Sequence, residues 1–246
     1  MWLPRWLGEA YAKLFTSFGV ELFTFSEAMK ALNVDKKWLN VAFSKLHAKR
    51  LLYIYSKTRP RLYRLLRPES FIVAAADKLK NLDKVKQERY LQLICDVALF
   101  LAKDFNASSI CIYGSVARGT ARLDSDLDLL VVSNTFRGSL TSRIEKLCQV
   151  EEAVAGELSY LRRHGVHASL SFYPLREEEV LRFPLILLDV VEEGVIIYDR
   201  ELFLEKALAK LKERLTRLGA KRVFVKEDSW YWDLKPGYTF GEVVEI

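Results

Sequence analysis

The sequence contains few of the residues that build disulfide-stapled or metal-rich proteins. Its 246 residues include only three cysteines and three histidines. Cys95, Cys111 and Cys148 are scattered among apolar residues without the spacing of zinc ligands, so we expect buried free thiols. The histidines form no His-x-x-x-His pair. A disulfide framework and a zinc centre are therefore not expected.

Long hydrophobic runs are also missing. No stretch of 18 uncharged apolar residues occurs, so we expect no membrane span. The first ten residues, MWLPRWLGEA, lack the apolar core of a secretion signal. Half of the residues are nevertheless hydrophobic, enough for a sizeable core. These features predict a cytoplasmic protein.

Positive charge is concentrated in the first quarter of the chain. Residues 1–67 hold 13 Lys and Arg against 4 Asp and Glu, a balance of +9, whereas the remaining residues have a balance of −3. Such an asymmetry indicates a module at the N-terminus that binds a polyanion.

The first 67 residues have the periodicity of three helices and two or three short strands. We expect a helix over 5–17, a short extended piece at 21–24, a helix capped by Ser26 and ending near 32, a helix over 36–49 capped by Asp35, and strands at 51–56 and 61–66.

That order of elements resembles a winged helix-turn-helix domain. The resemblance is one of layout, and it implies binding to duplex DNA or another nucleic acid through the helix 36–49 and the turn between the strands. The alternative is a protein-docking module whose basic residues only solvate its surface. The expected nucleic-acid contacts are Lys36, Lys37, Asn40, Ser44, His47, Arg59 and Arg61.

The rest of the chain alternates between helical and extended patterns. We divide it into a helical connector, 68–104, with a break at 81–83, and a second domain, 105–246 with a C-terminal extension, after the winged-helix domain 1–67. Within 105–246 we expect one long helix over 139–163, a strand over 166–173, a helix start at 176–180, a strand at 194–198, a helix over 201–218 and short strands near a Pro236-Gly237 turn.

Two carboxylates on one strand are the strongest chemical signal. Asp126 and Asp128 are separated by one residue, so both project from the same strand face, while Leu127 and Leu129 enter a core. Neighbouring like charges repel unless something neutralises them. A divalent cation does so, because Mg²⁺ is held by one or two carboxylates together with substrate phosphates.

The surrounding stretch, YGSVARGTARLDSDLDLLV at 113–131, resembles the motif of the nucleotidyltransferase superfamily, which includes DNA polymerase β and the minimal nucleotidyltransferases. The resemblance covers residues 95–200. It implies an α/β (α+β) fold, a small mixed sheet flanked by helices, and an NTP substrate, ATP being expected, with Mg²⁺ or Mn²⁺. Asp126 and Asp128 would be catalytic and hold the metal. Gly114, Ser115 and Arg118 would bind the nucleotide; alternatively, Arg118 and Arg122 lie on a solvated loop.

One feature departs from the family pattern. Active members usually carry a third carboxylate on a later strand, but 166–173 contains none and places Ser169 and Ser171 on the expected face. His167 lies on the same face and is either a substitute or an ordinary histidine of a strand edge. Two functions therefore stay open. One is an Mg²⁺-dependent nucleotidyltransferase with an unknown acceptor; the other is a DNA-binding regulator with a catalytically impaired, nucleotide-binding domain. A purely structural scaffold leaves the aspartate pair without a purpose.

Overall fold

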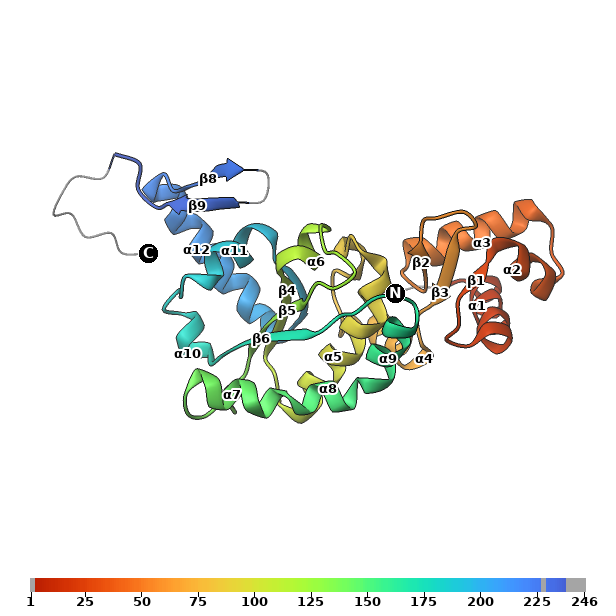
Figure 1. The fold of residues 1–246 in the computed structure, drawn as a ribbon, viewed down its shortest axis with the longest axis horizontal. Coiled ribbons are helices and arrows are strands. Elements are labelled where there is room, and N and C mark those ends of the chain that lie inside the picture. The colour runs from red at the N-terminus through yellow and green to blue at the C-terminus, as the bar shows by residue number, and fades with distance from the viewer. Residues whose placement is uncertain (1–2, 227–228, 238–246) are drawn as a thin grey trace.

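The chain forms an elongated molecule with three parts in sequence order (Figure 1). The computed structural model describes residues 3–226 and 229–237. A helical N-terminal region lies at one end, a four-stranded sheet with helices on both faces lies in the middle, and a two-stranded hairpin lies toward the other end. None of the helices in the described ranges combines the length and apolar character that crossing a membrane requires.

The N-terminal region builds its own apolar core from three helices and a small antiparallel sheet in the order β1-β3-β2. Leu7, Leu14, Leu39 and Leu46 are fully buried there, because their helical spacing places them on inward faces. The elements are α1 (Arg5–Phe18), β1 (Phe23–Thr24), α2 (Phe25–Leu32), α3 (Lys36–Ala48), β2 (Leu52–Ser56) and β3 (Leu62–Leu65).

The N-terminal caps of α2 and α3 test the expectations from the sequence, one of which is correct and one wrong. Asp35 caps α3 as expected, since its carboxylate accepts a hydrogen bond from the Trp38 N–H at 2.9 Å. The expectation that Ser26 caps α2 is wrong. Thr24 is the N-cap and forms a capping box with Glu27, in which each residue satisfies a backbone N–H of the other.

The connector is less regular than its sequence suggests. Its helices are α4 (Pro68–Ala75) and α5 (Leu91–Asp104), and the expected short break is a segment from 76 to 90 that contains two 3₁₀ turns, Leu82–Lys84 and Glu88–Tyr90. α5 is buried along most of its length and packs under the central sheet.

The central sheet has the strand order β6-β5-β4-β7, in which β5 and β6 are parallel and the other pairs antiparallel. The fold is thus a mixed α/β fold with a small mixed sheet flanked by helices, as expected. Leu127 and Leu129 are fully buried on the α5 side, as expected, and Leu130 packs on the opposite side. The strands are β4 (Ser109–Tyr113), β5 (Leu127–Val132), β6 (Leu170–Leu175) and β7 (Val195–Asp199).

Several helices around the sheet differ from expectation. The segment 139–163 is broken into α7 (Leu140–Leu147), α8 (Gln149–Ala153) and α9 (Ala155–Arg163), because helical hydrogen bonding is interrupted near 148 and 154. Strand β6 begins at Leu170, later than 166. The helix α11 was missed. The remaining elements are α6 (Gly114–Arg118), α10 (Glu177–Val180), α11 (Ile186–Glu193), α12 (Phe203–Leu218), β8 (Lys221–Lys226) and β9 (Ser229–Asp233).

A buried ion pair ties the N-terminal region to the central part. Arg64 on β3 donates two hydrogen bonds to Glu157 on α9, at 2.5 and 2.8 Å, and its guanidinium lies 3.6 Å from the centre of the Tyr160 ring. Both charged side chains are almost fully buried. The pair fixes a contact between segments 93 residues apart.

The three cysteines are free thiols. Cys95 and Cys111 are buried, as expected, but Cys148 is exposed, because it falls at the interruption between α7 and α8.

Candidate active site

The turn from β4 into the short helix α6 brings the backbone against Asp128. Gly114 opens α6 with a φ of +69°, a conformation that residues with a Cβ rarely adopt. A Cβ on Gly114 would lie 2.1 Å from Oδ2 of Asp128. Only glycine therefore permits this approach of the Gly-Ser turn to the carboxylate.

The two aspartates and two serines lie together where β5 and β6 begin. Asp128 and Ser171 lie on these strands, whereas Asp126, expected on the same strand as Asp128, and Ser169 immediately precede them. β5 and β6 run in parallel register with Asp128 opposite Ser171, and the Leu127 N–H donates to the Ser169 carbonyl. The Ser169 hydroxyl donates to Oδ1 of Asp126, and Ser171 forms a side-chain hydrogen bond with Asp128. Hydroxyl groups that bind the two aspartates thus lie where the family resemblance predicts a third carboxylate.

The surroundings of Asp128 disfavour its negative charge. Burial is the main cause that raises the pKa of this carboxyl, and the nearby charges of Asp126 and Glu193 raise it further. The hydrogen bond from Ser171 and the positive charge of Arg118 act in the opposite direction. A cation at this place would remove the repulsion between the two carboxylates.

The donor set fits a hard divalent cation only in combination with a substrate. In the described part of the chain, no group of three or more His, Cys, Asp or Glu is close enough to enclose a metal ion. Asp126 and Asp128 supply two carboxylates, which is what Mg²⁺ takes from a protein when phosphate oxygens and water complete its shell. These two residues would hold the ion.

Arg118, at the end of α6, is engaged by other side chains. Its Nη1 lies 2.6 Å from Oε1 of Glu193, and its guanidinium lies 5.0 Å from the centre of the Trp230 ring. Arg222 shares this arrangement, with Nη2 at 3.2 Å from the second oxygen of Glu193 and its guanidinium 3.7 Å from the same ring. Asp189 accepts a hydrogen bond from Trp230 Nε1 at 3.2 Å.

The sequence did not predict that residues of α11 and of the hairpin β8–β9 lie at this site. The apolar pattern that ends before Gly194 is a signal for α11, which carries Asp189 and Glu193. No local pattern indicates that the hairpin returns to α6, because its contact with Arg118 joins segments more than 100 residues apart. Among the sequence candidates, Ser115 is half-buried in α6, and Arg122 and His167 are exposed.

The candidates for nucleic-acid contact lie in the N-terminal region. Most of them are exposed, on α3 or on the turn between β2 and β3. His47 differs, because its Nε2 lies 2.8 Å from Oε1 of Glu88 in the connector. The exposed candidates are Lys36, Lys37, Asn40, Ser44, Arg59 and Arg61.

Comparison with known proteins finds a matching family and a similar protein. Residues 94–241 match the family described as "Nucleotidyltransferase domain". A relative named "Putative protein adenylyltransferase" from Methanocaldococcus jannaschii is 29% identical over 120 residues, which are 49% of this chain and 76% of that protein.

Similarity to solved structures is more distant. A toxin-antitoxin complex with AMP-PNP has a TM-score of 0.32 and 18% identity, over 50% of this chain and 90% of that chain. A mutant of the toxin-antitoxin pair MntA-HpeT has a TM-score of 0.32 and 16% identity, over 50% and 88%. The family match spans more than half of the chain, including the Gly-Ser turn and both aspartates. The chain belongs to the nucleotidyltransferase domain family.

Proposed function

We propose that this chain is an Mg²⁺-dependent nucleotidyltransferase that moves an NMP from an NTP to an acceptor. The observation that carries the proposal is the contact of Gly114 with Asp128, which lies beside Asp126 and next to the Gly-Ser turn. In this reaction an acceptor oxygen attacks the α-phosphorus and pyrophosphate leaves. A divalent ion held by the two aspartates would supply charge stabilisation of the reacting phosphate.

The chain's own residues have definite roles in this proposal. Gly114 and Ser115 bring backbone close to the place where phosphate oxygens would meet the aspartates. Ser169 and Ser171 orient the carboxylates through their hydrogen bonds. Arg118 would bind phosphate after release from Glu193, since it starts in that ion pair. Neither serine accepts a proton readily, so the acceptor loses its proton to solvent or to an aspartate.

ATP is the first donor to test, and a protein is the first acceptor class, because the relative from Methanocaldococcus is named a protein adenylyltransferase. The assay uses α-labelled ATP, Mg²⁺, the purified chain and cell extract, with labelled products separated by size. We expect label transfer that Asp126→Asn abolishes. Asp124→Asn is the matched control, since Asp124 is an exposed neighbour of the same charge. Transfer that survives Asp126→Asn would place the chemistry elsewhere.

The second candidate function is a DNA-binding regulator whose nucleotidyltransferase domain binds a nucleotide without transferring it. The observation in its favour is the pair of hydroxyls, Ser169 and Ser171, where active members usually carry an acid. In the same assay this candidate predicts nucleotide binding without labelled product or pyrophosphate.

For both candidates we propose that residues 1–67 form a winged helix-turn-helix domain that binds duplex DNA, followed by the connector 68–104 and the catalytic domain 105–246. The order α1-β1-α2-α3-β2-β3 and the antiparallel sheet β1-β3-β2 support this proposal. Helix α3 would enter the major groove with its exposed face, and Arg59 and Arg61 would contact phosphates. The charge balance of +9 supports a polyanionic partner.

Salt dependence tests this proposal. Each phosphate that is neutralised adds roughly −0.9 to the slope of log affinity against log salt. The double substitution Lys36→Ala and Lys37→Ala should weaken binding of the full chain to duplex DNA and reduce the slope by roughly 1 to 2. The control, Lys210→Ala with Lys212→Ala, removes the same charge from exposed positions of the helix α12. Equal effects of both pairs would contradict a site on α3.

A further inference from the structure

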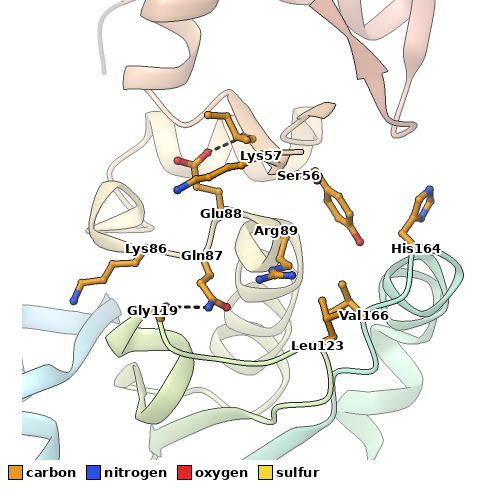
Figure 2. Close-up of a pocket in the computed structure, with 12 residues that line it drawn as sticks. Ser56, Lys57, Lys86, Gln87, Glu88, Arg89, Gly119, Leu123, His164 and Val166 are labelled. Atoms are coloured by element: carbon orange, nitrogen blue, oxygen red, sulfur yellow. Dashed lines mark hydrogen bonds between the residues drawn. The ribbon is translucent and has the colours of Figure 1, made fainter. Parts of the chain in front are cut away.

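A cavity of about 400 Å³ lies where the N-terminal region, the connector and the catalytic sheet meet. We call it the junction pocket. Its walls come from β2, from the segment 86–89, from the loop that joins α6 to β5, and from the end of α9 (Figure 2).

Three basic residues that line the junction pocket have no ion-pair partner within residues 3–226 and 229–237. They are Lys57, Lys86 and Arg89. The one carboxylate in the lining, Glu88, already binds Arg50 at 2.5 Å and the Ile54 N–H at 2.7 Å. Lys86 already donates to the Arg118 carbonyl at 3.1 Å, so an anionic ligand group would meet Lys57 and Arg89.

Aromatic and apolar side chains also line the junction pocket. They belong to Tyr55, Leu123 and Val166, and Figure 2 shows Arg89 near the centre, between Gln87 and the pair Leu123 and Val166. The Tyr55 ring packs edge-on against His164, with centroids 5.7 Å apart. A flat, partly polar ring fits such a wall by stacking and apolar contact.

Two buried polar atoms of the lining lack a hydrogen-bond partner in the described part of the chain. They are the hydroxyl oxygen of Tyr55 and Oε1 of Gln87. Buried polar atoms in folded proteins are nearly always paired, with protein, water or ligand. The pocket thus combines cations, a ring-binding wall and unused hydrogen-bonding groups.

We propose that the junction pocket binds a nucleoside monophosphate unit, either as a free nucleotide or as one unit of a single strand. Its phosphate would contact Arg89 and Lys57, and its base would lie against Tyr55 and Leu123. The volume falls within the usual range of about 300–1,000 Å³ for ligand pockets. This is a second nucleotide site, separate from Asp126 and Asp128.

A ligand in the junction pocket would affect the loop between α6 and β5 through the segment 86–89, which lines the pocket and donates hydrogen bonds to that loop. Lys86 donates to the Arg118 carbonyl at 3.1 Å, and Gln87 donates to the carbonyls of Gly119 and Ala121 at 3.1 and 2.9 Å. These bonds hold the backbone that leads from α6 to Asp126. A ligand phosphate that attracts Lys86 would compete with the first of them.

Titration calorimetry of the full-length chain in EDTA tests the proposal, with AMP and a six-nucleotide single-stranded DNA as separate probes. EDTA removes any metal-dependent binding at Asp126 and Asp128, so failure of nucleotidyl transfer does not affect the result. We expect at least one probe to bind. Arg89→Gln and Lys57→Ala should each weaken that binding roughly fivefold or more, the loss expected for one solvent-exposed charge contact.

Lys84→Ala is the matched control, because Lys84 is an exposed lysine of the same connector that does not line the pocket. It should change affinity less than twofold. Binding of AMP alone identifies a free nucleotide as the ligand, and tighter binding of the oligonucleotide that depends on Lys57 or Arg89 identifies a strand. The proposal is overturned if neither probe binds, or if the pocket variants bind as tightly as the control. Should Arg89→Gln fail to fold, Lys57→Ala decides alone.

Discussion

The contact between Gly114 and Asp128 predicts that replacing Gly114 by alanine abolishes nucleotide binding. In Gly114→Ala, the new methyl group would lie 2.1 Å from Oδ2 and 3.0 Å from Cγ of Asp128. The carboxylate must rotate away from the Gly-Ser turn, because β5 fixes its backbone between two paired strands. The left-handed backbone costs about 1–2 kcal/mol more with alanine than with glycine, which is a fall in Tm of roughly 2–8 °C for a chain of this size.

A second glycine separates the displacement of the Asp128 carboxylate from the cost of the left-handed backbone. Gly165 has a φ of +78° and nothing within 4 Å of its ideal Cβ, so Gly165→Ala carries the backbone cost alone. Thermal melting with and without Mg²⁺ and ATP is the assay. A ligand at 100 times its Kd stabilises by about 2.7 kcal/mol, a rise in Tm of roughly 5–11 °C. Wild type and Gly165→Ala should show this rise and Gly114→Ala should not; a full rise in Gly114→Ala would refute the reasoning.

Three further substitutions test the role of Ser171 at the candidate site and the stability contributed by two ion pairs. Ser171→Asp places a third carboxylate beside Asp128 and should increase pyrophosphate release from ATP; no gain over an inert wild type would favour the regulator. Hydrogen bonds from Arg143 lower the pKa of Glu179 to about 2, so this carboxylate stabilises the fold above about pH 4.5 and that contribution disappears as the pH falls toward 2. Glu179→Gln should cost about 1 kcal/mol in urea unfolding at pH 7 and much less at pH 2; an equal cost at both values contradicts the assignment. Arg64→Met leaves Glu157 buried and unpaired and should cost about 3–5 kcal/mol, whereas adding Glu157→Leu should recover most of it; a double variant as unstable as the single one would show that packing, and not the charge, matters.

Local rules were sufficient where the decisive contacts are close in sequence. The carboxylate of Asp35 reaches the N–H of Trp38 three residues on, so the start of α3 was predictable. Alternation along β5 placed Leu127 and Leu129 in the core. The same reasoning failed for α2, because Ser26 and Thr24 are both acceptable caps and the partner Glu27 selects Thr24. The apolar stripe of 139–163 continues through α7, α8 and α9, and a stripe alone does not report the interruptions between them.

Composition and motif thus determined that this chain contains a nucleotidyltransferase domain with Asp126 and Asp128 two residues apart, since that information is contained within about twenty consecutive residues. Only the structure shows that Asp126 lies immediately before β5 and Asp128 on it. Only the tertiary structure decided what surrounds the pair. The tertiary structure places Ser171 in register with Asp128, pairs Arg118 with Glu193, and brings Arg89 together with the other segments that line the junction pocket. These contacts join segments from about 30 to about 80 residues apart, and sheet order and helix packing, which depend on the whole core, determine which of them form.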